Sequence, residues 1–498
     1  MTRRDRYKAA LAAAISAVVC LAGGPSPYPD HVCAQTIASP DPKARLITAG
    51  CKFGVSENSG QINALTDASL TTVWTSSGDA YIDISAAPGE EVGSVYIQWE
   101  APPDVRNVSA YYPHSVRPAG SSGTESGPDG YTFVNDFIAL PGPASGIRIS
   151  WSKQTGSVSV AGVRVFSPGE VPLDIQQWKP MLEKADMLLI STHADDEHLY
   201  FGGAMPVYAG EYGKKVQVAY FVDHGILRTR ELLGGLWEVG VTNYPLISDF
   251  PDQYVGSYDA AVDFYGLEEA LEFQVMLLRR FKPEVVLGHD LDGEYGHGAH
   301  MLNARSLTMA LDLAADPEKY PELETEYGVW DVKKCYLHLY EENEIIMDWT
   351  LPLAHFGGRS GWDMAKAGYD HHVSQHRFKF LVRIEGPNDC RRFGLFRSTV
   401  GPDIARNDFF ENIPVAEVTE PAPTVTPSGG SVISGDDPDN SGASSAVSDP
   451  GPDGDDMIFY FVPAVAGLII IMIILLFFSS QKNRRKKKKG MKHPGRTR

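Results

Sequence analysis

One stretch near the C-terminus, Met457–Phe478, is apolar throughout. A helix needs about 20 such residues to cross the hydrocarbon core of a bilayer, and Pro463 and Gly467 are tolerated in a membrane helix. The basic run 482–489 follows at once, and positive residues stay on the cytoplasmic side of a membrane. The sequence therefore predicts one transmembrane helix over 457–478 and a basic cytoplasmic tail over 479–498, with everything before the helix outside the cell.

The N-terminus has the pattern of a secretory signal peptide. Basic residues among the first eight precede an apolar run over 9–23, and Val32-Cys33-Ala34 has small residues where a signal peptidase would cleave. We expect a signal peptide over 1–34, although cleavage nearer Ala22 and an uncleaved N-terminal anchor both stay open. Together the two ends predict a single-pass protein of the cell membrane with an extracellular folded part.

Composition separates the folded part from a linker. The chain is 43% hydrophobic, a value typical of globular proteins, yet residues 415–456 are rich in Pro, Thr, Ser, Gly and Asp. Such a segment cannot bury enough surface to offset its ordering entropy, so a disordered acidic stalk is expected there. The formal net charge of −19 argues against nucleic acid as a partner, because phosphate binding needs an excess of Lys and Arg.

Five cysteines are present, and Cys20 and Cys33 would leave with the signal peptide. The other three form no Cys-x-x-Cys pair, which argues against a cysteine zinc site. In an exported domain, Cys335 and Cys390 can form a disulfide. Two unpaired buried thiols are the alternative.

Two folded regions remain. Over 45–167, short segments with period-two alternation are broken by Gly, Pro, Ser and Asn, which is typical of an antiparallel β-sandwich. Over 175–413, strands alternate with helices, which predicts an α/β, Rossmann-like domain with a mainly parallel sheet. The expected strands are 80–84, 93–99, 146–151, 158–166, 186–192, 216–222 and 284–288, and the expected helices are 266–281 and 298–315.

The first strand of the α/β region ends in the sequence His193-Ala194-Asp195-Asp196-Glu197. Ligands of open α/β sheets bind outside the carboxyl ends of the strands, so a site is expected here. An imidazole and a carboxylate three residues apart on such a turn can reach one cation, which would offset the repulsion of three consecutive acids. A solvated acidic helix start, favoured by the helix dipole, is the alternative.

A second cluster follows the strand that ends at Gly288, and it contains Tyr295, His297 and His300. It too should lie at the carboxyl edge of the sheet, and the two histidines are spaced to share one face where a helix begins. Two histidines and one carboxylate from two strand ends suit a zinc site with a position left for water. Iron or cobalt would suit the same ligands.

Together the two clusters resemble the motifs of the PIG-L/LmbE-like N-acetylglucosaminyl deacetylases, and the resemblance covers residues 185–412. Arg228-Thr229-Arg230-Glu231, followed by 236–241, is similar to the Arg-x-x-Glu helix of that family, and 369–375 is similar to its Ser-Gln segment. The resemblance implies three zinc ligands, two catalytic residues and two substrate contacts. The implied zinc ligands are His193, Asp196 and His300. Asp195 would be the general base, and His297 would stabilise the oxyanion or act as an acid. Arg228 and Tyr295 would contact the substrate.

The sequence departs from the family pattern at two positions. Ala194 stands where the family usually has Pro, which should matter little. Ala299 stands where the family often has Asp, between the two histidines of the second cluster. The loss of that carboxylate leads to the hypothesis that His297 is less readily protonated here.

The remaining polar residues near the motifs are expected to be structural. Glu197 should orient the motif rather than bind metal. The histidines expected to be structural or on the surface are His198, His224, His289, His371, His372 and His376, with a secondary role left open for His289.

Residues 62–74 and 160–166 resemble the opening and closing segments of discoidin-like, galactose-binding-fold modules, over about 120 residues of the chain. Such modules often bind glycans, so the resemblance implies a glycan ligand, with a simple spacer as the alternative. We expect Trp74 in the core rather than on a sugar-binding surface.

These observations predict a cell-surface enzyme that removes the N-acetyl group of a GlcNAc-containing glycan or glycoconjugate by zinc-dependent hydrolysis. One alternative is a surface glycan-binding protein whose deacetylase domain is catalytically degenerate. Another keeps the enzyme and changes the amide substrate, since a fold and a motif do not set the acyl group or the sugar.

Overall fold

The computed structural model describes residues 43–112, 115–118, 133–154 and 156–414. The predicted signal peptide, stalk, transmembrane helix and cytoplasmic tail lie outside these residues. Among the residues that are described, no helix is long and apolar enough to cross a membrane. The chain divides into a unit of residues 1–416, which holds every described residue, and a second unit of residues 417–498.

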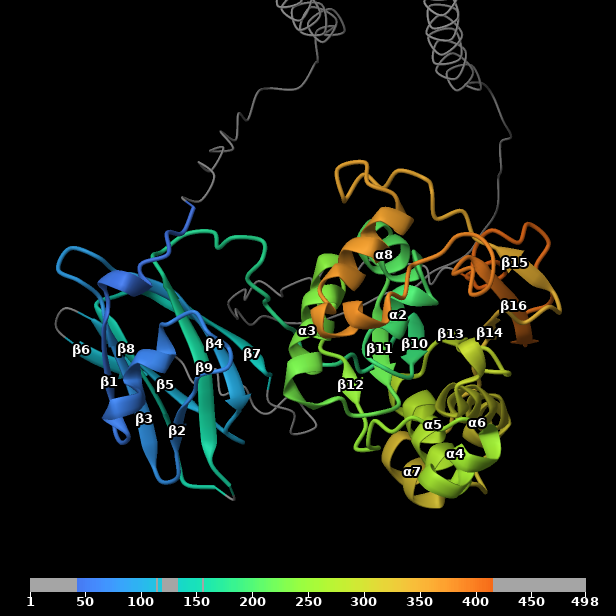
Figure 1. Cartoon of the computed structure of the whole chain (residues 1–498), viewed down its shortest axis with the longest axis horizontal. Coiled ribbons are helices and arrows are strands. Elements are labelled where there is room, and N and C mark those ends of the chain that lie inside the picture. Colours follow the sequence, from blue (N-terminus) through green and yellow to red (C-terminus); the bar gives the residue numbers. More distant parts are fainter. Residues whose placement is uncertain (1–42, 113–114, 119–132, 155, 415–498) are drawn as a thin grey trace, which may run out of the picture. The chain divides into compact units, whose positions relative to one another are not determined.

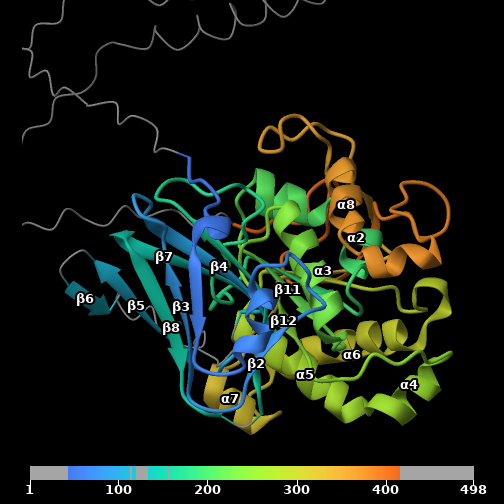
Figure 2. The same cartoon turned by 60° about the vertical axis from the view of Figure 1, so that its left-hand side comes forward.

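The N-terminal region is an antiparallel β-sandwich, as predicted (Figure 1, Figure 2). Its five-stranded sheet has the order β1-β3-β8-β5-β6, and its four-stranded sheet has the order β2-β9-β4-β7. The strands are β1 (Lys52–Val55), β2 (Trp74–Ser76), β3 (Ala80–Ser85), β4 (Val92–Ala101), β5 (Asn107–Tyr112), β6 (Ser115–Pro118), β7 (Asn135–Ala144), β8 (Gly146–Trp151) and β9 (Val158–Phe166).

Three tryptophans fill the centre of the sandwich. Trp74 and Trp99 each contact Trp151 edge to face, with ring centroids 5.8 and 5.5 Å apart. All three indole rings are buried in the hydrophobic core between the two sheets. The prediction that Trp74 belongs to the core is therefore confirmed.

The second region is an α/β domain around a seven-stranded sheet of order β12-β11-β10-β13-β14-β16-β15. The first five strands in this order are parallel, and the last two pair antiparallel, so the sheet is mixed but mostly parallel. The strands are β10 (Met187–Ser191), β11 (Val216–Tyr220), β12 (Leu246–Ile247), β13 (Val285–Gly288), β14 (Lys334–His338), β15 (Glu344–Ile346) and β16 (Arg392–Ser398).

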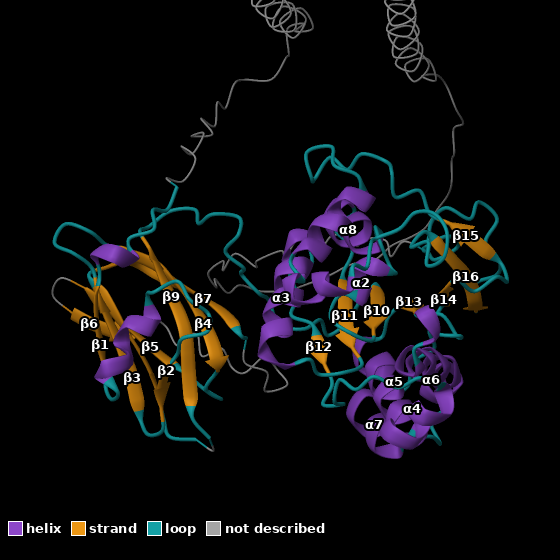
Figure 3. Cartoon of the chain, viewed as in Figure 1, coloured by secondary structure: helices purple, strands orange, loops and turns teal. Residues whose placement is uncertain are grey.

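Helices cover both faces of this sheet (Figure 3). Along β10, Met187 and Leu189 pack on one face with α3 and α8, whereas Leu188 and Ile190 pack on the other with α4, α5 and α6. Burial on both faces explains why this strand is apolar at its first four positions, from Met187 to Ile190. The helices are α2 (Asp196–Leu199), α3 (Gly225–Glu238), α4 (Tyr258–Tyr265), α5 (Leu267–Phe281), α6 (Gly298–Ala315), α7 (Pro321–Tyr327) and α8 (Gly361–Asp370).

The strand order places the two sequence clusters together. β10 pairs with β11 on one side and with β13 on the other. The sheet therefore grows from β10 first toward β11 and β12, and then on the opposite side toward β13 and β14. This is a topological switch point, the place where ligands bind in doubly wound sheets. The segments after β10 and β13 therefore meet at the same carboxyl edge, as the sequence predicts.

The disulfide between Cys335 and Cys390 is not present. Both thiols are free and buried, and they belong to core clusters on opposite faces of the sheet. Burial raises the pKa of each thiol to about 12, which makes them unreactive. The alternative prediction, that Cys335 and Cys390 are unpaired buried thiols, is therefore confirmed.

Candidate metal centre and active site

Three predicted ligands converge at the carboxyl edge of the sheet. Nδ1 of His193 lies 3.0 Å from Nε2 of His300, and Oδ2 of Asp196 lies 3.0 and 3.1 Å from these two nitrogens. All three side chains are buried. Donor atoms around a tetrahedral zinc ion are about 3.3 Å apart, because each bond is about 2.0–2.2 Å long. The three residues therefore fit a shared cation.

The electrostatics of this group favour a positive charge among the three donors. Burial alone would lower the pKa of His300, but Asp196 and Glu294 outweigh it and raise the pKa to about 10. Burial would raise the pKa of Asp196, yet His300 and His193 hold it well below its usual range. A divalent cation can take the place of the proton that these groups would otherwise share.

A buried carboxylate orients the ligand His300. Oε2 of Glu294 lies 2.7 Å from Nδ1 of His300 and 2.8 Å from Nδ1 of His289, and Oε1 lies 2.8 Å from Nδ1 of His338. The Nδ1–H of His300 is thereby directed to Glu294, which leaves Nε2 with its lone pair toward Asp196. Neither Glu294 nor His338 was predicted to support the site.

Two histidines hold the backbone around His193. The N–H of Thr192 donates to Nε2 of His289 at 2.9 Å, and the N–H of Ala194 donates to Nε2 of His224 at 2.8 Å. Both imidazoles accept hydrogen bonds from the turn that carries the ligand. The structural role expected of His224 is confirmed. For His289, whose secondary role was left open, the structure shows that it supports the turn and contacts the same carboxylate of Glu294 as His300 does.

Asp195 adopts an unusual backbone conformation. Its φ is +127°, a region that residues with a Cβ rarely occupy, and its N–H donates to Oε2 of Glu197 at 2.7 Å. Such strain persists where surrounding contacts enforce it and is common at functional sites. Glu197 thus orients the motif, as expected. Burial and the neighbouring charge of Asp196 raise the pKa of the Asp195 carboxyl well above its usual value.

Arg228 contacts the predicted base from α3. Its Nη2 donates to Oδ1 of Asp195 at 3.2 Å, and its Nη1 donates to Oδ2 of Asp252 at 2.7 Å. One turn further along α3, Glu231 accepts from the N–H and the hydroxyl of Ser374 at 2.7 and 2.6 Å. The Arg-x-x-Glu motif therefore connects the base to the Ser-Gln segment, whose Gln375 lies at the site.

His297 has a different environment from the ligands. Burial first, and then the neighbouring His193 and His300, lower its pKa to about 3. Its Nδ1 is buried and has no hydrogen-bond partner among the described residues. Tyr254 and Tyr295 both pack against its ring, with centroids 4.9 and 5.7 Å away.

A pocket of about 440 Å³ opens at this site. Six of the seven predicted site residues line it, and the seventh, His300, lies beneath at 0% exposure. The pocket rim carries exposed aromatic rings, and Arg377 and Gln375 add polar groups. Its lining residues are His193, Asp195, Asp196, Arg228, Asp252, Tyr254, Tyr295, His297, Gln375, Arg377, Phe378 and Phe380.

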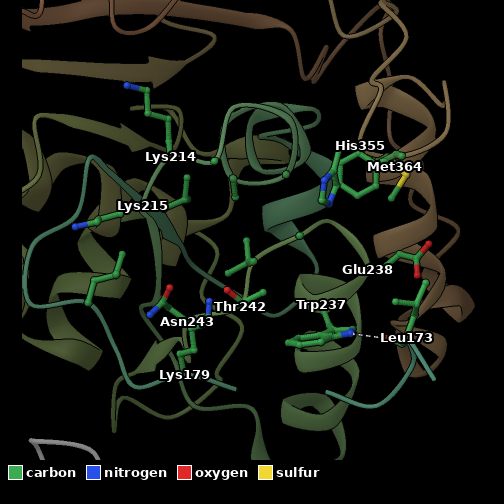
Figure 4. A pocket seen from close by; sticks show the side chains of 18 of the residues that line it. Leu173, Lys179, Lys214, Lys215, Trp237, Glu238, Thr242, Asn243, His355 and Met364 are labelled. Carbon is green, nitrogen blue, oxygen red and sulfur yellow. Dashed lines mark hydrogen bonds between the residues drawn. The ribbon is translucent and has the colours of Figure 1, made fainter. Parts of the chain in front are cut away.

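A larger pocket of about 850 Å³ lies elsewhere on the α/β domain (Figure 4). Lys179, Lys214, Lys215 and Asn243 line it, and the Trp237 indole donates to the carbonyl of Leu173 at 2.7 Å across one side. It contains none of the predicted site residues. Volume alone therefore does not identify the reactive site, whereas the convergence of donor atoms does.

The chain is similar to known deacetylases over part of its length. No family model matches the sequence. A 1D-myo-inositol 2-acetamido-2-deoxy-alpha-D-glucopyranoside deacetylase of Streptomyces avermitilis is 30% identical over an alignment of 183 positions, and the match covers 30% of this chain and 60% of that protein. The same enzyme of Rhodococcus opacus is 27% identical over an alignment of 239 positions, and the match covers 42% of this chain and 79% of that protein.

The chain thus spans less than two thirds of the Streptomyces avermitilis relative. Among solved structures, a conserved protein of Thermus thermophilus matches with 19% identity and a TM-score of 0.29, covering 39% of this chain and 81% of that one. The family 32 CBM of Clostridium perfringens NanJ matches with 14% identity and a TM-score of 0.21, covering 25% and 98%. The α/β region is distantly homologous to the GlcNAc-inositol deacetylases of the PIG-L/LmbE family, the family that its motifs resemble.

Proposed function

We propose that the chain is a metal-dependent deacetylase that hydrolyses the N-acetyl group of a GlcNAc-containing surface glycan or glycoconjugate and releases acetate. The observation that carries this proposal is the set of three donor atoms of His193, Asp196 and His300, which lie 3.0–3.1 Å apart beneath an open pocket. The homology to deacetylases of a GlcNAc-inositol supports the same amide chemistry. We propose zinc as the ion, because one carboxylate and two imidazoles are a common zinc donor set.

Asp195 is proposed as the general base. A bound zinc ion would acidify water and polarise the carbonyl oxygen of the amide. The carboxylate of Asp195 lines the pocket beside the ligands, and Arg228 donates to its Oδ1, which leaves the other oxygen to accept a proton from water. The hydrogen bonds of Asp195 with Glu197 and Arg228 hold this residue in its strained conformation and position its carboxyl.

His297 is proposed to act on the substrate amide from the side opposite to Asp195, on the oxyanion or on the leaving amine. Its Nδ1 has no hydrogen-bond partner among the described residues, so no carboxylate at that atom fixes which ring nitrogen carries the proton. A neutral imidazole N–H in the pocket can donate a hydrogen bond to the oxyanion as it forms. A protonated one can pass a proton to the leaving amine.

The pocket rim suits a sugar. The exposed rings of Tyr295 and Phe378 can cover the apolar face of a pyranose, and Arg228 and Gln375 are polar partners for hydroxyl groups. A volume of about 440 Å³ accommodates one or two sugar rings. A glycan ligand for the β-sandwich remains a separate proposal, which the resemblance to discoidin-like modules supports.

The test is acetate release by the purified full chain from GlcNAc oligomers, peptidoglycan fragments and GlcNAc glycolipids, with and without a chelator. Release that the chelator abolishes and zinc restores is the expected result. A chain that holds metal but releases no acetate from any of these would favour the alternative of another amide substrate. A chain that neither holds metal nor releases acetate would favour a degenerate, glycan-binding protein.

We also propose that the enzyme is anchored at the cell surface through the apolar run 457–478, with its catalytic domain outside and its basic tail in the cytoplasm. Removal of residues 457–498 should move the protein from the membrane fraction to the medium. A truncated protein that stays with the membrane would contradict the anchor.

A further inference from the structure

A second cluster of titratable side chains begins one residue after the predicted ligand Asp196. Glu197, His198 and His372 are each 0% exposed, and each offers one donor atom to a space in which all three atoms lie within 4.8 Å of one another. Nε2 of His372 lies 3.0 Å from Oε1 of Glu197, and Nε2 of His198 lies 3.5 Å from the same oxygen. The reaction proposed above does not use this cluster.

The donor atoms of the cluster have no hydrogen-bond partner within the described part of the chain. Oε1 of Glu197 and both ring nitrogens of His198 and of His372 are buried and unpaired. The short contact between His372 and Glu197 therefore lacks the direction of an N–H···O hydrogen bond. A buried polar atom without a hydrogen-bond partner lowers the stability of the fold. Three residues that direct such atoms at one another therefore indicate an ion or molecule bound between them.

Two glycines make room for the His198 ring. A Cβ on Gly235 of α3 would lie 2.5 Å from its Nε2, and a Cβ on Gly368 of α8 would lie 2.2 Å from its Cε1. Neither contact is sterically possible, so larger side chains are excluded at both positions. The helix α8, which carries Gly368, packs against both α2 and α3 (Figure 3).

We propose that Glu197, His198 and His372 bind a second divalent cation of the zinc class, apart from the metal centre at His193, Asp196 and His300. Two imidazoles and one carboxylate are a zinc donor set, and the separations of 3.0 and 3.5 Å lie around the value of about 3.3 Å for tetrahedral ligands. A buried water is the rival occupant. The cation fits better because it also balances the carboxylate charge, which no described arginine or lysine neutralises.

The second ion would act on the position of Asp195. Oε1 of Glu197 faces the ion, while its Oε2 accepts the N–H of Asp195 at 2.7 Å. Fixing this carboxylate holds the backbone of Asp195 at its φ of +127°. The site is therefore structural, and its existence does not depend on the proposed deacetylase activity.

The two sites should differ in affinity. Nδ1 of His300 donates to Glu294, whereas the outer nitrogens of His198 and His372 have no partner among the described residues. Such outer partners strengthen metal binding by about 10- to 100-fold. The second site should therefore lose its ion at a lower chelator concentration than the first.

The test counts ions on the full chain. Purified wild-type protein is stripped with chelator, reconstituted with zinc alone, and measured by elemental analysis; two ions per chain are expected. His198→Asn and His372→Asn should each hold one, His193→Asn should hold one, and the double variant His193→Asn/His198→Asn should hold none. His355→Asn, at an exposed histidine, should hold two and serves as the matched control.

A wild-type chain that binds one zinc, or a His198→Asn variant that still binds two, would overturn the proposal. Cobalt substitution of the unmodified chain gives a second count from the visible absorption spectrum, which needs no variant to fold. Acetate release is measured in parallel. Normal release with one ion per chain rejects only the second site, whereas two ions without release reject only the proposed function.

Discussion

Oε2 of Glu294 lies 2.7 Å from Nδ1 of His300, so one fully buried carboxylate sets the tautomer of a predicted metal ligand. The same carboxyl group also contacts Nδ1 of His289 and of His338. Burial alone would raise the pKa of Glu294, but these histidines, His289 first, hold it well below its usual range. The ligand is thus fixed by an anion that three imidazoles stabilise.

Glu294→Gln should therefore weaken metal binding. The amide keeps the size of the side chain but removes the negative charge and directs N–H groups at imidazoles that already donate. We expect zinc affinity to fall by about 10- to 100-fold, the usual effect of losing an outer partner of a ligand. Competition with a fluorescent chelator measures this change. Asp292→Asn, in the same loop but with a side chain 91% exposed, is the control and should bind zinc normally.

Asp195→Asn should separate catalysis from metal binding. The amide has the shape of the carboxylate and retains an oxygen for Arg228, but it cannot take a proton. Loss of a general base typically costs about 10²- to 10⁴-fold in rate, so kcat should fall by that factor while zinc content and KM change little. Steady-state acetate release and elemental analysis on the same sample test both halves. A variant within threefold of wild-type kcat would remove Asp195 from the mechanism.

Glu231→Ala should affect substrate binding more than chemistry. Glu231 accepts two hydrogen bonds from Ser374, and the adjoining Gln375 lines the pocket. Hydrogen bonds to a charged group contribute about 1.5–3 kcal/mol each, so the Ser374–Gln375 segment should lose its position and KM should rise roughly tenfold or more. Glu238→Ala, at the C-terminal end of α3, removes a surface ion pair with Arg359 and should leave KM unchanged.

The sequence predicted the features of this molecule that depend on short stretches of chain. The buried run of β10 and the motif that follows it are local, and so is the start of α6 at Gly298, which appears where it was expected. Parallel pairing then brings the two motifs to one edge, because carboxyl ends of parallel strands share an edge. These elements place the two clusters together, whereas the choice of His193, Asp196 and His300 as the ligands came from the resemblance to the PIG-L/LmbE-like deacetylases.

Contacts between distant segments could not be predicted in this way. His338 reaches Glu294 across 44 residues, and Ser374 reaches Glu231 across 143, through elements whose packing no local pattern specifies. The antiparallel strands β15 and β16 at the sheet edge were missed for the same reason. The one sequence feature that could have pointed to Glu294 as a support of the site is its place in a glycine-flanked turn. The structure shows a positive φ at both glycines, Gly293 and Gly296.

Ala299→Asp tests the hypothesis that a missing carboxylate changes the protonation of His297. Burial, then His193 and His300, lower the pKa of His297 to about 3, and its Nδ1 has no partner among the described residues. A carboxylate within about 4–6 Å favours the imidazolium and raises such a pKa by roughly 1–3 units. A group that must be protonated loses activity as the pH rises through its pKa. The alkaline limb of the pH–rate profile should therefore move to higher pH in the variant.

The matched control is Ala299→Asn, which adds the same bulk at a position that is fully buried but adds no charge. Thermal unfolding of both variants shows whether the larger side chain is accommodated. If the Asp variant shifts the alkaline limb and the Asn variant does not, the charge acts on His297 in its protonated form. A profile that stays unchanged in a folded, metal-loaded Ala299→Asp enzyme would instead mean that His297 works as a neutral hydrogen-bond donor, and that the alanine at this position does not set the pH dependence.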